Sequence, residues 1–139
     1  YRARYPPRAS YFYTISEAEK NSLPAYGWVL EGVAFYAHNI QELGTVPVYR
    51  INSPTGHFFT ITVAEVNYVL TFPGWVYEGV AFYTYPVQTA GTVPIYRLYS
   101  PARNNRLWDF LQLRCCHDED DMLGRFFKSF QKSITCLCG

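Results

Sequence analysis

Charged side chains are scarce in this sequence: Asp, Glu, Lys and Arg together make up only 17% of the 139 residues. Soluble domains average about 25%, so uncharged side chains must cover part of the surface. The 12 basic and 11 acidic residues give a formal charge of +1 and form no basic block. The electrostatic attraction to phosphate on which nucleic-acid binding depends is therefore missing, and no nucleic-acid partner is predicted.

Long apolar runs are missing as well. No stretch of about 18 apolar residues occurs, which argues against a membrane-spanning helix. The opening residues, Tyr1 to Ser10, contain no apolar signal core, so we expect the chain to begin after a removed segment. A length of 139 residues suits one domain with its own core.

Tyrosine, proline and cysteine divide the sequence into two parts. All 13 Tyr and all nine Pro lie at or before Pro101, whereas all four Cys and half of the basic residues lie after it. We therefore assign residues 1–101 to a repeat domain and residues 102–139 to a divergent tail.

Residues 1–101 are built from a repeat. Three ordered motifs return at a spacing of 47: Gly27-Trp28-Val29 as Gly74-Trp75-Val76, Glu31 to Tyr36 as Glu78 to Tyr83, and Gly44 to Pro47 as Gly91 to Pro94. This spacing predicts a first unit at residues 1–48, a second at 49–95 and the start of a third at 96. Three such units nearly equal the chain length. We therefore predict a closed three-unit fold, mainly β with short helices and β-trefoil-like.

Both units have the same predicted order of elements. A strand such as Val46 to Ile51, a turn at Ser53 to Gly56 and a strand His57 to Ile61 make a hairpin. The capping boxes Ser16-x-x-Glu19 and Thr62-x-x-Glu65 open helices Glu17 to Leu23 and Val63 to Leu70, with each hydroxyl expected to accept from the amide of the Glu. Trp28 to Tyr36 and Trp75 to Tyr85 are each predicted to form two short strands around a tight turn at Glu-Gly.

These ordered motifs, Tyr-Arg, Ser-Pro, Gly-His-Phe-Phe-Thr, a capped helix, Gly-Trp and Glu-Gly-Val-Ala-Phe-Tyr, resemble a domain-of-unknown-function family of secreted tandem repeats. Residues 1–101 carry the match. The resemblance implies a secreted, extracellular module, found alone in fungi or appended to bacterial cell-surface hydrolases, with a carbohydrate-binding or adhesive role. It brings no catalytic residues. The first unit departs from the motif at Tyr11, where the second has His57.

The candidate binding residues are aromatic and charged side chains, most of them repeated. They are Trp28, Trp75, Tyr36, Tyr83, His57, Glu31, Glu78, Arg50 and Arg97. Exposed rings stack on sugars, although strand alternation places most such rings in a core. Glu31 and Glu78 have two interpretations: a glycosidase pair, or, favoured, ion pairs with Arg50 or Arg97 or caps on backbone amides.

No catalytic residue, metal or cofactor is predicted. Nucleophilic catalysis requires a base within reach of the nucleophile, and none of the three His is duplicated between the units. The tail cysteines, Cys115, Cys116, Cys136 and Cys138, allow free thiols, a disulfide between the two clusters or a zinc site, in decreasing order of preference.

The tail itself is predicted to be helical. Asn104 to Cys116 and His117 to Ser133 have helical patterns, the second with an apolar stripe that includes Phe126, Phe127 and Phe130. The tail is either a native cap in place of the missing unit or, slightly favoured, the product of a reading-frame or splicing change.

Together these patterns predict a secreted, lectin-like, non-catalytic binding module with a glycan or cell-wall polysaccharide as its ligand. A protein-interaction or adhesion module of the cell surface is the alternative, and a small hydrolase is a third interpretation. Strand edges left open by an incomplete third unit would also favour self-association.

Overall fold

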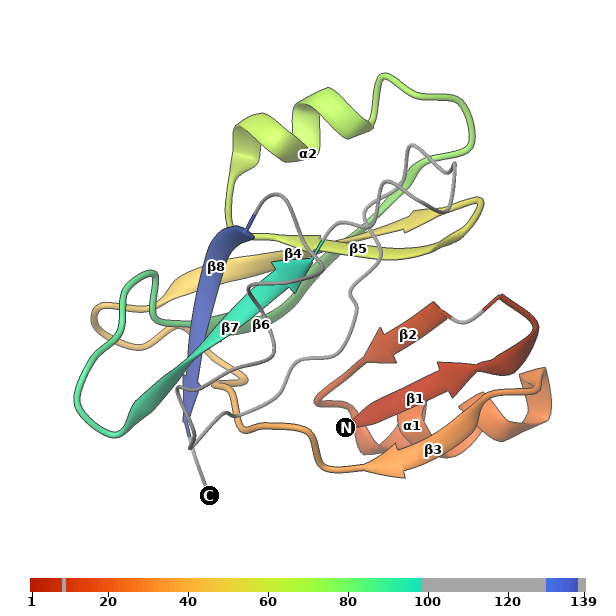
Figure 1. The fold of residues 1–139 in the computed structure, drawn as a ribbon, viewed down its shortest axis with the longest axis horizontal. Coiled ribbons are helices and arrows are strands. Elements are labelled where there is room, and N and C mark those ends of the chain that lie inside the picture. Colours follow the sequence, from red (N-terminus) through yellow and green to blue (C-terminus); the bar gives the residue numbers. More distant parts are fainter. Residues whose placement is uncertain (9, 99–129, 138–139) are drawn as a thin grey trace.

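The computed structural model describes residues 1–8, 10–98 and 130–137, with side chains for residues 1–8 and 10–95. These residues form two three-stranded antiparallel sheets, one two-stranded antiparallel sheet and two short α-helices (Figure 1). The chain is therefore mainly β, as predicted. No helix in this described part is long and apolar enough to cross a membrane.

The first unit contains a sheet with the strand order β2-β1-β3. Its elements are β1 Arg2–Tyr5, η1 Pro6–Arg8, β2 Ser10–Tyr13, α1 Glu17–Ser22, η2 Leu23–Tyr26 and β3 Val29–Gly32. The helix α1 begins where predicted, because the Ser16 side chain accepts from the Glu19 amide at 3.2 Å.

The second unit contains a sheet with the corresponding order, β5-β4-β6. Its elements are β4 Val46–Ser53, β5 Gly56–Thr60, α2 Val63–Val69 and β6 Val76–Thr84. The helix α2 begins after Thr62 as predicted, but the predicted cap bond is wrong, since the Thr62 side chain makes none. Instead the Thr62 amide donates to Thr60 Oγ1 at 3.0 Å, and that hydroxyl also donates to Glu65.

The two sheets have the same register. Ala3 lies opposite Phe12 and Leu30, and Ile51, 48 residues later, lies opposite Phe58 and Tyr77. In the first unit Leu23 of η2, and in the second unit α2, packs on the sheet together with a tryptophan. Trp28 contacts the cluster of Ala3, Phe12 and Leu23, and Trp75 contacts the cluster of Ile51, Phe58, Val66 and Val69.

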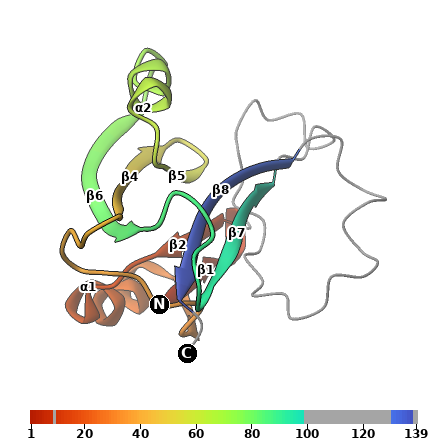
Figure 2. The same ribbon diagram turned by 90° about the vertical axis from the view of Figure 1, so that its left-hand side faces the viewer.

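A third antiparallel pair joins strand β7 Thr92–Leu98 to β8 Phe130–Leu137 (Figure 2). The tail was predicted to be helical through Ser133, and this is wrong for Phe130 to Ser133, which belong to β8. The backbone at β7 resembles β4, because the register shifts between Ile95 and Tyr96 as it does between Val48 and Tyr49. The other predicted tail helix residues, and Cys115, Cys116 and Cys138, lie outside the described residues.

The main core lies where the three sheets meet. Its buried members come from five strands and are Tyr13, Val48, Phe59, Phe82 and Ile95, with Phe35 packed against them. Phe59 is only 1% exposed. Because each sheet is too small to bury its own apolar face, this shared cluster is what holds the sheets against one another.

Candidate functional site

The Glu-Gly motif forms a β-bulge in each unit. In the second sheet Arg50 lies opposite Gly79 and Ile51 lies opposite Tyr77, so Glu78 is the extra residue between them. Gly79 has a φ of 104°, and a Cβ there would meet no atom within 4 Å, so backbone conformation alone favours glycine. The predicted tight turn between two strands is therefore wrong, because β6 continues through the motif.

The bulge aims each repeated glutamate at the arginine across the sheet. Glu78 Oε2 lies 2.7 Å from Arg50 Nε, and Glu31 Oε2 lies 2.7 Å from Arg2 Nε. In both units the arginine Nε has no acceptor in good hydrogen-bond geometry, so these contacts act chiefly through charge. The favoured interpretation of Glu78, an ion pair with Arg50, is what the structure shows.

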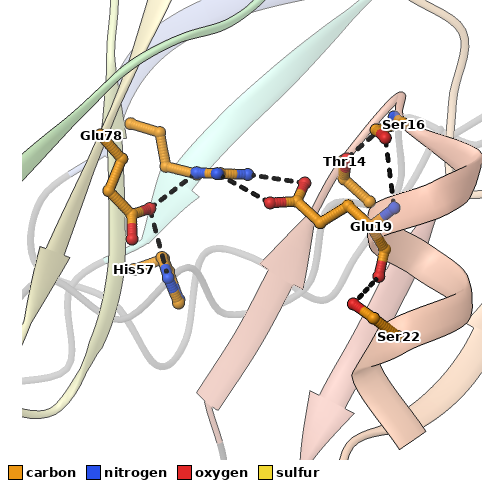
Figure 3. Close-up of polar contacts among 7 residues, drawn as sticks. Thr14, Ser16, Glu19, Ser22, His57 and Glu78 are labelled. Atoms are coloured by element: carbon orange, nitrogen blue, oxygen red, sulfur yellow. Dashed lines mark hydrogen bonds and ion pairs between the residues drawn. The ribbon is translucent and has the colours of Figure 1, made fainter.

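Arg50 connects the two units. Its Nη1 and Nη2 donate to Glu19 Oε2 and Oε1 at 3.0 and 2.9 Å, and Glu19 belongs to α1 of the first unit (Figure 3). The guanidinium carbon also lies 4.7 Å from the centre of the Phe12 ring. A forked, two-bond contact to a carboxylate fixes orientation as well as distance. Arg50 therefore holds α1 against the second sheet.

His57 extends the same network on the side of Glu78. Its Nε2 lies 3.5 Å from Glu78 Oε2, and its ring packs edge-on to Phe12 with centroids 4.6 Å apart. The Nδ1 atom is buried without a hydrogen-bond partner among the described residues. His57 thus belongs to the joint between the units, and at the equivalent place of the first unit the ring of Tyr11 lies 5.7 Å from the guanidinium carbon of Arg2.

The carboxylates of this network are held ionised. The hydrogen bond from His57 is the main cause that lowers the pKa of Glu78, and the charges of His57 and Arg50 add to it against the opposing effect of burial. Burial also opposes ionisation of Glu19, but hydrogen bonds from Arg50 and Thr14 outweigh it and lower the pKa of Glu19. Both groups are therefore charged at neutral pH.

A shallow depression lies on the first unit, with a volume of about 210 Å³. Tyr1, Arg2, Lys20, Leu30, Gly32 and Val33 line it. The Lys20 ammonium lies 4.3 Å from the centre of the Tyr1 ring and 3.0 Å from Glu17 Oε1. Leu30 and Val33 are 39% and 55% exposed, so apolar surface faces solvent here.

The same surface of the second unit carries two tyrosines. By register, Tyr49 and Val80 lie opposite each other on β4 and β6, and Tyr77 lies three residues before Val80 on β6. The rings of Tyr49 and Tyr77 are 6.3 Å apart, and Tyr77 is 45% exposed. We call the two places the first-unit and second-unit aromatic surfaces, defined by Tyr1, Leu30 and Val33 and by Tyr49, Tyr77 and Val80.

The predicted site residues occupy separate places. His57, Glu78 and Arg50 come together at the joint, whereas Glu31 pairs with Arg2 and Arg4 in the first sheet. The tryptophans are half-buried in packing contacts: Trp28 against Tyr5, Phe12 and His57, and Trp75 against Phe58 and Phe72.

The two tyrosines of the predicted set lie elsewhere again. Tyr36 is 53% exposed. Tyr83 is half-buried and exchanges two backbone hydrogen bonds with His38, of 3.0 and 2.9 Å. The side chain of Arg97 lies outside the described part of the chain.

Sequence reasoning missed Glu19 and the aromatic surfaces. Glu19 was interpreted only as the glutamate of a capping box. That motif predicts contacts at the start of its own helix and says nothing of contacts with residues of another unit. A signal was present, since Glu65 occupies the same position of the second capping box, 46 residues later. The two repeated acids have different described partners, the guanidinium of Arg50 at Glu19 and the hydroxyl of Thr60 at Glu65.

A family model described as "Domain of unknown function (DUF5648)" matches residues 1–110. No curated protein matches the chain, and no solved structure matches it.

Proposed function

This chain belongs to the family described as a domain of unknown function, DUF5648, and we propose that it is a secreted, non-catalytic module that binds carbohydrate. The observation that carries the proposal is the second-unit aromatic surface. Tyr77 exposes 45% of its surface beside the ring of Tyr49, and Val80 is 44% exposed. Flat rings with a polar edge stack on the apolar faces of sugars. Glycans of cell-wall polysaccharide are the ligands we favour.

The proposal includes a β-trefoil-like arrangement of three units. The main core supports it, because Val48 and Ile95 occupy equivalent positions, as do Tyr13 and Phe59. The shared register shift of β4 and β7 supports it as well. Repetition would give one weak sugar site per unit, and several weak sites together strengthen attachment to a polymer.

The carboxylates of the joint support a binding role over hydrolysis. A glycosidase needs one carboxylic acid with a raised pKa to protonate the leaving group. Glu19 and Glu78 instead have lowered pKa values, and both are bound by Arg50. Glu31 is bound by Arg2 and Arg4 in the other sheet, so the two repeated glutamates do not face a common bond.

A protein-binding or adhesive role is the second candidate. β6 is an edge strand of its sheet among the described residues, paired on its outer side only by the bridge between Tyr83 and His38, and Val76 on it is 59% exposed. An edge strand offers unpaired backbone groups to a partner's strand, and a second copy of the chain is one such partner. Soluble saccharide would not compete with that mode of binding.

A glycan array followed by titration calorimetry tests the proposal. The variant Tyr77→Ala should weaken binding of any saccharide hit by at least about fivefold, since stacking contributes roughly 1–3 kcal/mol per ring in comparable contacts. Tyr68→Ala is the matched control, because Tyr68 is 65% exposed on α2, away from this surface. Binding of no saccharide, or equal affinity in the two variants, would refute the proposal.

A further inference from the structure

We propose that the second-unit aromatic surface selects a neutral, curved β-glucan of the laminarin type, with Tyr49 and Tyr77 stacking on successive sugar rings. The inference rests on the proposed carbohydrate-binding function and adds the class of polysaccharide and the feature that selects it. That feature is the angle between the two tyrosine rings.

The two tyrosines share one face of the second sheet. Tyr77 lies opposite Ile51 across β4 and β6, and Tyr49 lies two residues before Ile51 on β4. Residues two apart on a strand point to the same face, and so do residues opposite each other on neighbouring strands. Both rings therefore stand on the side of Ile51, and Val80, opposite Tyr49, completes the surface.

The main charged cluster of this sheet lies on its other face. Arg50 follows Tyr49 on β4, so its side chain points away from the aromatic surface, to the side where Glu78 contacts it. A carboxylate does reach the β5 side of the aromatic face, since Thr60 lies opposite Tyr49 and its hydroxyl donates to Glu65. A negative charge at this place repels acidic saccharides. The surface therefore suits a neutral glycan.

The rings of Tyr49 and Tyr77 are inclined to each other. Their centroids are 6.3 Å apart, and the angle between their planes is 50°. Packing fixes this angle, because Tyr49 is held against the buried cluster around Ile51 and Phe58, and Tyr77 belongs to the strand β6. A ligand that stacks on both rings must therefore present two sugar faces that are inclined to each other as well.

Polysaccharides differ in the angle between neighbouring sugar rings. A cellulose-type β-glucan is a nearly flat ribbon, so one of its faces can stack on only one of two rings inclined by 50°. In a laminarin-type β-glucan each glucose is linked through the hydroxyl of its third carbon, which turns it relative to the next glucose and curves the chain into a helix. Such a chain can place successive sugars on Tyr49 and Tyr77. The additional stacked ring should raise the affinity by at least about fivefold.

The first unit offers an internal comparison. Leu30 lies opposite Ala3 as Tyr77 lies opposite Ile51, so an aliphatic side chain takes the place of the second ring. Among the described residues that line the depression on the first unit, Tyr1 supplies the one aromatic ring. The first-unit aromatic surface should therefore not distinguish a curved glucan from a flat one.

The probes are laminarihexaose and cellohexaose, two soluble glucose oligomers of equal length that differ in their linkage. Methyl NMR signals of Val80 and Val33 report binding at the second-unit and first-unit surfaces separately. At Val80 we expect laminarihexaose to bind at least about fivefold tighter than cellohexaose, because it gains one stacked ring. At Val33 we expect no preference for either oligomer.

Removing either ring should abolish the preference at Val80. Tyr77→Ala, and Tyr49→Leu with an apolar side chain kept against Ile51, should each bring the ratio of the two affinities to within about twofold of one. Tyr26→Ala is the control, because Tyr26 is 73% exposed on η2 of the first unit, outside both aromatic surfaces, and it should leave the ratio unchanged. Because Tyr77 is an exposed residue of an edge strand, Tyr77→Ala keeps the test valid even if Tyr49→Leu destabilises the fold.

The possible outcomes separate this inference from the proposed function. If cellohexaose binds at Val80 as tightly as laminarihexaose, or if the preference survives in both variants, selection by the ring angle is refuted while sugar binding stands. If maltohexaose, a curved but α-linked glucose oligomer, binds more tightly than laminarihexaose, the β-glucan assignment is wrong. If none of the three shifts Val80, the inference is refuted, and the glycan array with Tyr77→Ala decides the broader proposal.

Discussion

At the scale of single residues, Arg50 is a polar joint between the two units, in addition to the shared apolar core. Its guanidinium binds one carboxylate from each unit and covers the face of Phe12. Burial alone would lower its pKa, but Glu19 and Glu78 outweigh that effect and raise it. Removing the charge would leave two partly buried carboxylates facing each other without a cation.

We therefore expect Arg50→Gln to lower the free energy of unfolding by about 2–4 kcal/mol, somewhat less than the ~3–5 kcal/mol of a fully buried pair. Urea denaturation followed by tryptophan fluorescence measures this change. Glu17→Ala removes the exposed pair with Lys20 and should cost only about 0.3–0.5 kcal/mol. Equal effects of the two variants would show that Arg50 is not a structural joint.

At the scale of elements, the sequence predicted the helices and hairpins closely and the Glu-Gly segments poorly. Capping boxes and prolines are local signals, so α1 and α2 begin at the predicted residues. The Glu-Gly motif was interpreted as a turn because a positive-φ glycine suits both a turn and a bulge. Only the partner strand, which local sequence does not reveal, distinguishes the two.

The two helix starts give a test at this scale. Ser16→Ala removes an observed cap bond and should destabilise the protein by about 1 kcal/mol. Thr62→Ala should cost clearly less, because the Thr62 hydroxyl caps nothing and Thr60 takes over the contact to its amide. Melting temperatures of the two variants and the parent protein measure the difference. A larger loss for Thr62→Ala would contradict the observed capping.

At the scale of the whole molecule, the joint between the units was the part that sequence could not predict. The repeat predicted the order of strands within each unit, because similar sequence motifs adopt similar structures. It said nothing of how one unit lies on the next, since Glu19 and Arg50 are 31 residues apart and neither motif contains both. The tail was the part that the sequence predicted least well. Phe130 to Ser133 have a helical sequence pattern, but in the structure they belong to a strand that pairs with β7.

Because the joint depends on ionised carboxylates, the stability of the whole molecule should fall in acid. Glu19 and Glu78 have folded-state pKa values below the unfolded value of 4.5, so the unfolded chain takes up protons first as the pH falls. Their contribution to stability is complete above about pH 4.5 and is lost progressively as the pH drops through the folded-state values. Urea unfolding at steps from pH 7 to pH 3 should therefore give a steadily lower free energy of unfolding below about pH 4.5.

In Arg50→Gln the main source of the lowered pKa of Glu19 is gone, so the loss of stability between pH 4.5 and pH 3 should be smaller than in the parent protein. Parallel curves for the two proteins would mean that other carboxylates, and not those of the joint, control unfolding in acid.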